Sequence, residues 1–337
     1  GEVLVGHVEA HLLEQFAGPG GRGRARGDGG GDVLAPATVA RPFGVARYGE
    51  PMPEPMRVVL AASGAEQFNV LRDTCLAAGH EPVAYVVSRS MRPRSPVDAW
   101  MVESLSTIVT RLPDEIDLLV PASGDGLARQ LVGYRPDLVV VHGFNWRLPV
   151  RVLEMATYGA INAHPSLLPK YRGPAPVLAA IRAGDPSIGL TVHRMDEGFD
   201  TGPTLVQRDG IVLDEWVTPA LLWSRLGPVL AEALTESFTM IADGAPGKPQ
   251  GDAGASYAGF IEPEFSSIDW GRTAAQIHHQ VRMFAYMGRA PVGVVDGVRL
   301  RVVRTSLAEA DGLRMECADT PIWIVESAPE ADQPSRA

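Results

Sequence analysis

Short apolar runs alternate with longer amphipathic stretches from residue 56 onward. The run 56–62 (MRVVLAA) predicts a buried parallel strand. Three small residues follow, then a helical pattern over 66–78, and 82–87 (PVAYVV) predicts a second strand. A strand, a tight turn, a helix and a strand form a βαβ unit with a right-handed crossover. The start of this region therefore predicts a parallel sheet covered by helices.

The alternation continues to residue 242. Pro228 lies inside the last helical pattern, so a break in that helix is expected. The predicted fold class is α/β, with a Rossmann-like, mostly parallel sheet. Further strands are predicted at 117–120, 136–141, 159–163 and 188–195, and helices at 126–133, 175–183 and 213–242.

Segments rich in glycine and proline divide the chain. The Gly/Arg-rich stretch 18–32 cannot bury a core, and the Pro/Gly stretch 243–255 is typical of a linker. Beyond the linker, 292–303 (VGVVDGVRLRVV) predicts a β-hairpin. The expected organisation is a disordered or leader segment at 1–55, a catalytic domain at 56–250, a smaller domain at 251–320 and a tail at 321–337.

Two polar residues, Asn162 and His164, stand at the end of the predicted strand 159–163. Because side chains alternate along a strand, both lie on the same face, and Pro165 ends the pairing after them. Ligands of open α/β sheets bind at the carboxyl ends of the strands. An amide beside an imidazole suits a reaction in which a carbonyl oxygen gains charge and a proton moves. Turn chemistry with a hydrogen-bonded core histidine is the alternative explanation of the pair.

A longer ordered string surrounds the pair. It reads HPSLLPKYRG from His164, then GDPSIG at 184–189, then TVHRMDEGFDTGP at 191–203. This string resembles the folate-dependent formyltransferase superfamily, which includes glycinamide ribonucleotide transformylase and methionyl-tRNA formyltransferase. The resemblance extends over roughly 56–303, and a string of this length is more specific than a short motif.

The resemblance implies formyl transfer from the co-substrate N10-formyltetrahydrofolate to an amine. Asn162 and His164 then stabilise the oxyanion, His164 moves protons, and Asp200 orients or supports His164. The acceptor amine is the nucleophile, so no protein Ser or Cys is required. His193 resembles the family's second histidine, although a structural role at a strand edge is favoured. A small, open, OB-like β-barrel is implied for the second domain.

Members of the superfamily bind the folate with two loops, and both loops have counterparts in this sequence. The matching residues are Phe144, Trp146, Arg147 and Leu148 in one loop and Asp196, Glu197, Gly198 and Phe199 in the other. Trp146 is expected to stack on a folate ring, the alternative being packing on its own helix. The residues expected to contact the acceptor are Ser63, Gly64, Lys170 and Arg172. The Ser63–Gly64 turn either holds an anion through backbone N–H groups or is a plain tight turn.

Composition narrows the choice of partner. The net charge is −10, and the part from 205 to 337 holds 11 Lys and Arg against 18 Asp and Glu. Nucleic-acid-binding surfaces concentrate basic residues, so nucleic acid is disfavoured and a small-molecule amine is expected, such as an amino sugar, an amino acid or a carrier-bound amine. No apolar run reaches the roughly 20 residues that cross a bilayer, so no membrane partner is expected.

Cysteine usage indicates the compartment. Cys75 and Cys317 are too few for a disulfide framework or a metal cluster, which favours a cytoplasmic protein without a metal. Three alternative functions remain: hydrolysis of 10-formyltetrahydrofolate, formylation of methionyl-tRNA, and folate binding without catalysis.

Overall fold

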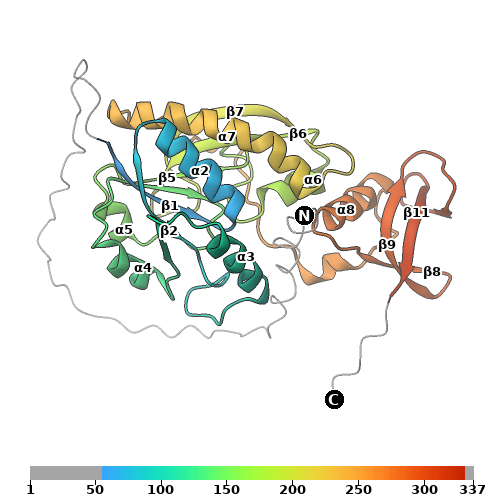
Figure 1. Ribbon diagram of the computed structural model, residues 1–337. Coiled ribbons are helices and arrows are strands. Elements are labelled where there is room, and N and C mark those ends of the chain that lie inside the picture. The colour runs from blue at the N-terminus through green and yellow to red at the C-terminus, as the bar shows by residue number, and fades with distance from the viewer. Residues whose placement is uncertain (1–54, 331–337) are drawn as a thin grey trace, which may run out of the picture.

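The computed structural model describes residues 55–330, which form a large α/β domain and a smaller domain beside it (Figure 1). The expected leader at 1–55 lies outside the described residues, apart from Pro55. The large domain contains β1 (Arg57–Ala62), α2 (Ala65–Ala77), β2 (Glu81–Val86), α3 (Ala99–Thr110), β3 (Asp117–Leu119), α4 (Gly124–Leu131), β4 (Leu138–His142), α5 (Val150–Met155), β5 (Ala160–His164), α6 (Pro176–Ala183), β6 (Ser187–Arg194), β7 (Thr204–Val212) and α7 (Pro219–Ala242). The smaller domain contains η2 (Pro263–Ser266), α8 (Ala274–Tyr286), β8 (Val292–Val295), β9 (Val298–Ser306), β10 (Leu313–Met315) and β11 (Ile322–Pro329).

The large domain is organised on a seven-stranded sheet with the order β3-β2-β1-β4-β5-β6-β7. Neighbouring strands from β3 to β5 pair in parallel, whereas β6 pairs antiparallel with both β5 and β7. The mostly parallel sheet predicted from the sequence is confirmed. From β1 the chain proceeds outward to β2 and β3 and then returns to β4 on the other side of β1. Such a reversal opens a crevice at the carboxyl ends of the strands.

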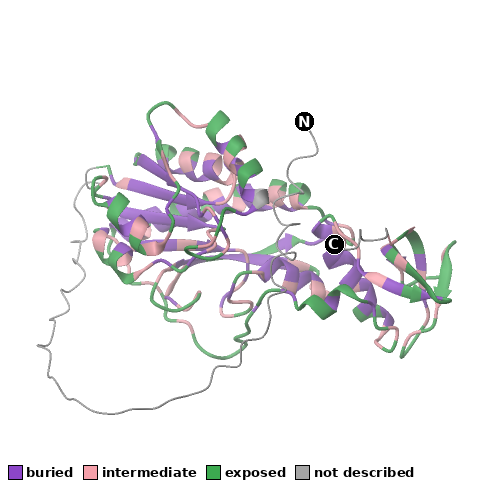
Figure 2. Cartoon of the chain, turned by 90° about the horizontal axis from the view of Figure 1, so that it is seen from below, coloured by how far each residue is buried: buried purple, intermediate pink, exposed green. Residues whose placement is uncertain are grey.

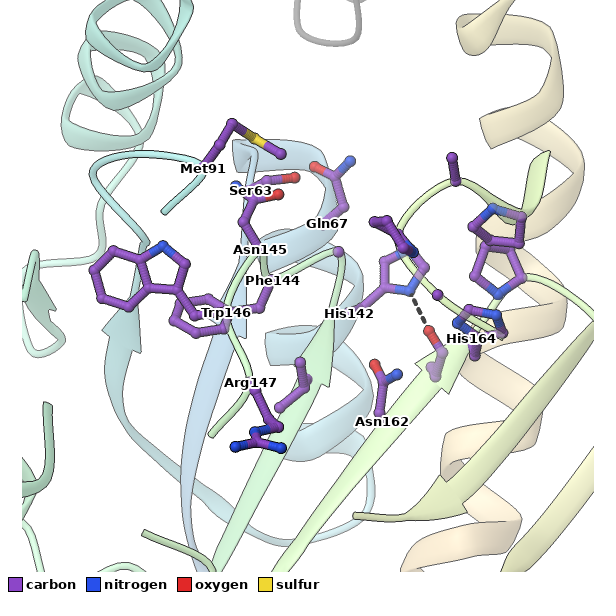
Figure 3. Close-up of a pocket in the computed structure, with 18 of the residues that line it drawn as sticks. Ser63, Gln67, Met91, His142, Phe144, Asn145, Trp146, Arg147, Asn162 and His164 are labelled. Carbon is purple, nitrogen blue, oxygen red and sulfur yellow. Dashed lines mark hydrogen bonds between the residues drawn. The ribbon is translucent and has the colours of Figure 1, made fainter. Parts of the chain in front are cut away.

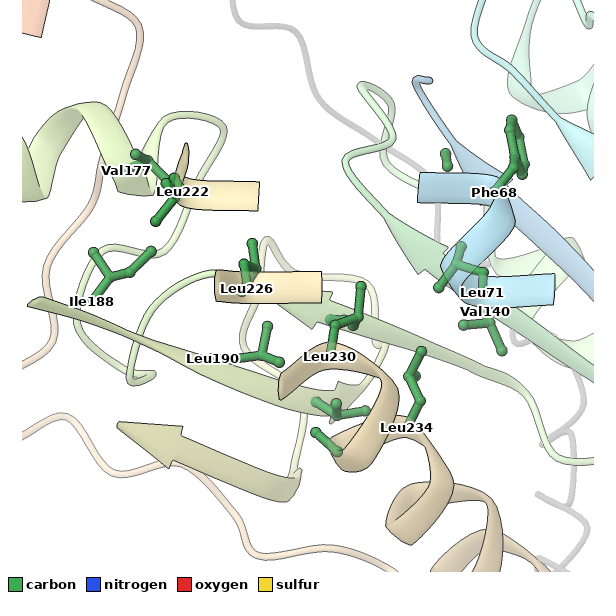
Figure 4. Packing of buried hydrophobic residues seen from close by; sticks show 14 of the residues in the cluster. Phe68, Leu71, Val140, Val177, Ile188, Leu190, Leu222, Leu226, Leu230 and Leu234 are labelled. Carbon is green, nitrogen blue, oxygen red and sulfur yellow. The ribbon is translucent and has the colours of Figure 1, made fainter. Parts of the chain in front are cut away.

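Strand β1 contributes to a core on each face of the sheet. Val58, Leu60 and Ala62 belong to the cluster that α2, α3 and α7 cover, and Val59 and Ala61 belong to the cluster under α4 and α5. Alternation along the strand produces this division, and burial on both faces explains the uninterrupted apolar run. Figure 4 shows the first cluster, in which leucines of α7 pack over the sheet. Figure 2 shows the buried sheet and the exposed outer sides of the helices.

Helix α7 runs without interruption through Pro228, so the predicted break is wrong. Pro228 is exposed, whereas Leu226 and Leu230 on either side of it are buried. The helical hydrogen bond lost at a proline is therefore lost on the solvent side, where water satisfies the freed carbonyl. The buried leucines hold the helix to the core on both sides of this point.

The smaller domain pairs a four-stranded antiparallel sheet with helix α8. The strand order is β10-β11-β9-β8, and Val302, Ile322 and Ile324 pack against Ile277 and Val281 of the helix. The second, small β domain predicted from the sequence is confirmed, and β8 and β9 form the predicted hairpin. The sequence predicted a tail at 321–337. This prediction is wrong for the first part of the segment, because strand β11 occupies it and pairs with β9. Alternation in β11 is obscured by two register shifts, one on each side of Glu326. Among the described helices, none is long and apolar enough to cross a membrane.

Two leucines of α2 provide a matched test of the core. Leu71 is fully buried under α7, and Leu76 on the same helix is 54% exposed. Leu71→Ala should lower the free energy of unfolding by about 2–5 kcal/mol, because it leaves a cavity, whereas Leu76→Ala should change it by less than about 0.5 kcal/mol. Urea unfolding followed by circular dichroism measures both. Equal effects in the two variants would contradict the assigned packing.

Candidate active site

A cavity of about 1100 Å³ opens at the carboxyl ends of β1, β4 and β5. Its wall includes the ends of these strands, the loops that follow β4 and β6, and the segment between the two domains. Figure 3 shows Asn162 and His164 projecting from the end of β5, with Phe144, Trp146 and Arg147 across the cavity. The cavity lies where the reversal of strand order opens the sheet, as expected for an α/β fold.

Asn162 faces a histidine on the neighbouring strand. In the antiparallel pair β5–β6, Asn162 lies directly opposite His193, and their side chains share one face. The Asn162 Nδ2 atom is 3.1 Å from Asp200 Oδ1 and 3.3 Å from His193 Nε2. The side-chain amide therefore has an acceptor for each of its two hydrogens, and both acceptors are protein groups.

His164 is 5% exposed and lies between a carbonyl and a carboxylate. Its Nε2 is 2.8 Å from the carbonyl oxygen of Tyr171, which only accepts, so Nε2 carries a hydrogen. Its Nδ1 is 3.6 Å from Asp200 Oδ2. Burial lowers the pKa of His164, and the Asp200 charge and the Tyr171 carbonyl act in the opposite direction without overcoming it. The imidazole is therefore neutral near pH 7, with Nδ1 free to take a proton.

Asp200 is the group to which the other polar residues converge. Its Oδ2 accepts a hydrogen bond from the Gly173 N–H at 2.8 Å, and its Oδ1 is 3.5 Å from His193 Nε2. Burial alone would raise the pKa of the Asp200 carboxyl, but His193, the charge of His164 and the Gly173 N–H together lower it to about 2. The carboxylate is thus ionised while only 14% exposed.

The two loops expected to hold the folate lie side by side on the cavity wall. Arg147 joins them, because its Nη1 donates to the Glu197 carbonyl at 2.9 Å and its guanidinium lies 5.8 Å from the centre of the Phe199 ring. Trp146 packs edge-on against Phe144 and donates its indole N–H to the Ser90 carbonyl at 2.6 Å. At 5% exposed, the indole offers the cavity only a small part of its surface. Seven of the eight residues expected in these loops line the cavity. The exception is Asp196, whose carboxylate accepts hydrogen bonds from the Gly198 N–H and the Thr201 hydroxyl within the turn.

The four residues expected to contact the acceptor separate into two groups. Ser63 and Gly64 line the cavity at the start of α2. Lys170 and Arg172 are not among the lining residues, because Lys170 pairs with Asp185 at 2.6 Å and Arg172 donates to the side chain of Gln250. Sequence proximity to His164 had suggested their position, but both side chains bond residues that do not line the cavity.

The comparisons with known proteins agree with this geometry. The sequence model of the family described as Formyl transferase matches residues 56–221. A methionyl-tRNA formyltransferase from Nitrosospira multiformis is 35% identical over 265 residues, which cover 76% of this chain and 82% of the relative. The chain belongs to the formyl transferase family. This formyl transferase is accordingly a one-carbon transferase.

Solved structures share the fold of this formyl transferase at low sequence identity. A 4-N formyltransferase from Francisella tularensis superposes with a TM-score of 0.57 at 16% identity, covering 73% of this chain and 96% of the other. A variant of HypX from Aquifex aeolicus superposes with a TM-score of 0.56 at 15% identity. That match covers 82% of this chain and only 44% of HypX.

Several residues of the site had no clear signal in the sequence. His193 was expected to be structural, yet it lies in direct contact with the Asn162–Asp200 pair. The alternation of TVHRMD placed it on one face of its strand, but the antiparallel pairing with β5 that brings it to Asn162 is not visible locally. Tyr257 and Phe260, in the segment between the domains, also line the cavity. No group of three or more metal-binding side chains occurs within residues 55–330.

The depressed pKa of Asp200 predicts an acid dependence of stability. Its folded-state pKa of about 2 is below the value of 3.8 that an unperturbed Asp has, so the carboxylate stabilises the fold above about pH 4 and loses this effect as pH falls towards 2. Asp200→Asn removes the contribution of the carboxylate charge to the free energy of unfolding. The difference in free energy of unfolding between the wild type and this variant should narrow by on the order of 2 kcal/mol from about pH 5 to about pH 2.

Urea titrations at a series of pH values measure this difference. Asp252→Asn, at an exposed position in the segment between the domains, is the control and should show a constant difference from the wild type. A pH-independent difference for Asp200→Asn would show that Asp200 is not ionised in the way described.

Proposed function

We propose that this formyl transferase moves the formyl group of N10-formyltetrahydrofolate to the amine of a small-molecule acceptor. The observation that supports this most is the meeting of an amide, an imidazole and an ionised carboxylate at the cavity wall. Asn162 and His164 both lie within 3.6 Å of Asp200. The cavity of about 1100 Å³ is slightly larger than an ordinary ligand pocket, which suits two substrates bound together.

The reaction begins when the neutral amine of the acceptor attacks the formyl carbon. A tetrahedral intermediate forms, and its oxygen carries the negative charge. Asn162 stabilises this oxygen by turning one amide N–H from its protein acceptor to the substrate. His193 permits the exchange, because its Nδ1 bonds the Arg194 carbonyl at 2.8 Å and so keeps the ring in place when the Asn162 N–H turns away from Nε2.

Proton transfer then completes the reaction. The attacking nitrogen must lose a proton, and N10 of the departing tetrahydrofolate must gain one. His164, neutral and with a free Nδ1, accepts the first proton and supplies the second. The Asp200 carboxylate, 3.6 Å away, stabilises the imidazolium that forms between the two steps.

The donor occupies the part of the cavity between the two loops joined by Arg147. Phe144, Leu148 and Phe199 provide the apolar wall, and the turn at 197–200 provides the polar edge for the amino and ring N–H groups of the pterin. Phe199 is 52% exposed and so has a ring face available for contact. The buried Trp146 supports this wall from behind.

The acidic balance of the chain favours a small acceptor. Residues 205–337 carry 11 basic against 18 acidic side chains, and the polyanionic backbone of a tRNA is bound by clusters of the opposite sign. Methionyl-tRNA is the second candidate acceptor, because the relatives with 32–35% identity are named methionyl-tRNA formyltransferases. The second domain present here is consistent with either acceptor.

Release of tetrahydrofolate tests the proposal. The purified protein is mixed with N10-formyltetrahydrofolate alone, with panels of amino sugars, amino acids and carrier-bound amines, and with methionyl-tRNA. Release that depends on one small amine supports the proposal and identifies the acceptor. Release without amine indicates hydrolysis, release only with methionyl-tRNA indicates the second candidate, and no release with any of them overturns formyl transfer.

Three alanine variants test the assignment of the catalytic groups. Asn162→Ala, His164→Ala and Asp200→Ala should each lower turnover by about a hundredfold or more, because each removes an oxyanion donor or part of the proton relay. Folding should be retained, as measured by circular dichroism and thermal unfolding. Turnover near that of the wild type in all three variants would discard the assignment.

A further inference from the structure

Gln250, in the segment between the domains, is bonded to the backbone that carries the catalytic carboxylate. Its Nε2 donates to the carbonyl of Asp200 at 2.9 Å and to the carbonyl of Gly202 at 2.7 Å. One side-chain amide thus uses both of its hydrogens on a single turn. Because Gln250 is 50 residues from Asp200 in sequence, this contact ties the interdomain segment to the active site.

Arg172 fixes the orientation of the Gln250 amide. Its Nε and Nη2 atoms donate to Gln250 Oε1 at 3.1 and 2.8 Å. Because the amide oxygen accepts these two hydrogen bonds from the guanidinium, the amide N–H groups point the opposite way, towards the carbonyls of Asp200 and Gly202. The guanidinium therefore determines which end of the amide faces the Asp200 turn.

The backbone around Arg172 is held from two sides. Its N–H donates to the Ser256 carbonyl at 2.9 Å, and its carbonyl accepts from the Ala258 N–H at 2.6 Å. The next residue, Gly173, donates its N–H to Asp200 Oδ2 at 2.8 Å. The turn after β5 and the interdomain segment consequently form one unit, which contacts Asp200 through its carboxylate and through its backbone.

The backbone of Asp200 needs such support. Its φ of 55° lies in the left-handed region, which a non-glycine residue adopts only when its surroundings hold it there. The turn is at the surface, with Glu197, Gly198 and Phe199 exposed. Without the Gln250 bonds, the turn would keep the local contacts of the Asp196 carboxylate, the bond from Arg147 to the Glu197 carbonyl and the side-chain contacts of Asp200, but no bond to the Asp200 carbonyl would remain from Gln250.

We propose that Gln250 and Arg172 are positioning residues that hold the Asp200 carboxylate against His164 for catalysis. This inference rests on the formyl transfer proposed above, in which Asp200 acts through His164. Neither residue touches the reacting atoms. The sequence predicted that Arg172 contacts the acceptor, whereas in this proposal it orients the Gln250 amide.

Kinetics of Gln250 variants provide the first test. Gln250→Ala should lower kcat by roughly 10- to 100-fold, the effect of a small displacement of a catalytic group, and should leave the KM for N10-formyltetrahydrofolate within about twofold. Gln250→Glu keeps an acceptor for Arg172 but has no hydrogen for the two carbonyls, so it should lose kcat to a similar degree. Lys248→Ala is the matched control, because the side chain of Lys248 is exposed and only its backbone bonds to Thr204.

The two Gln250 variants together test the positioning role even if one of them folds poorly. If Gln250→Ala is unstable, Gln250→Glu, with Arg172 still paired, carries the test. Wild-type kcat in a folded Gln250→Glu protein would overturn the proposal. A rise in KM for the donor with unchanged kcat would also overturn it, since that pattern indicates a role in binding.

A double-mutant cycle shows whether Gln250 acts through Asp200. In an Asp200→Ala background, Gln250→Ala should change kcat by less than about twofold, because the group that it positions is gone. A further loss of tenfold or more in that background would overturn the proposal. Arg172→Lys, which keeps the charge but not the fork, should resemble Gln250→Ala in the wild-type background.

Titration of His164 by NMR separates this proposal from the proposed function. The chain has eight histidines, and the His164 ring signal is assigned by its absence in His164→Gln. If the carboxylate moves away, the pKa of His164 should fall further in Gln250→Ala and stay unchanged in Lys248→Ala. A fall in pKa supports the positioning role even if no amine is formylated. An unchanged pKa overturns it even if formyl transfer is confirmed.

Discussion

An ionised carboxylate in a nearly closed environment is the constraint on which this active site depends. Asp200 is 14% exposed, and its charge is tolerated because an amide, two imidazoles and a backbone N–H surround it. Burying such a charge without these partners would cost several kcal/mol. These partners come from three segments, so the charge is stable only when strands β5 and β6 and the turn after β5 are all in place. In the proposed reaction, the same contacts allow the carboxylate to support the imidazole of His164.

The sheet brings these segments together. Parallel strands β1, β4 and β5 end at one edge, and the change to antiparallel pairing at β6 places His193 opposite Asn162. A shift of one residue in the β5–β6 register would turn Asn162 and His193 to opposite faces. The buried apolar residues on the alternate positions, Ile161 and Val192, prevent such a shift, because it would expose them. Core packing and catalytic geometry therefore depend on the same register.

Those features of the site that depend on local pattern could be predicted from the sequence. Asn162 and His164 follow from the alternation of one short strand and the proline after it. Asp200 lies 38 residues from Asn162, and only the resemblance of the whole string to a family connected the two. His193 was given a structural role, because the direction in which β6 pairs is set by tertiary packing. The contact between Arg172 and Gln250 spans 78 residues and joins a turn to a Pro/Gly-rich segment in which no periodicity exists.

The fold shows the same division. The parallel sheet and most helices follow from apolar periodicity, whereas the continuity of α7 through Pro228 depends on which side of the helix faces water. Strand β11 was missed because its register shifts interrupt the alternation on which a strand prediction relies. In both cases a local rule was overridden by packing against residues distant in sequence.

The segment that follows α7 was predicted to be a linker between domains, but Gln250 in this segment bonds the turn that carries Asp200. A fragment ending before Gln250 would retain Asn162, His164 and Asp200 and yet lack the side chain that donates to the Asp200 and Gly202 carbonyls. Exchange of whole second domains between related enzymes, in the laboratory or in evolution, would thus preserve chemistry only if the junction lay beyond Ile261. The side chain that bonds the Asp200 turn and three residues that line the cavity, Tyr257, Phe260 and Ile261, lie on one short stretch of chain, so neither set can diverge far without the other.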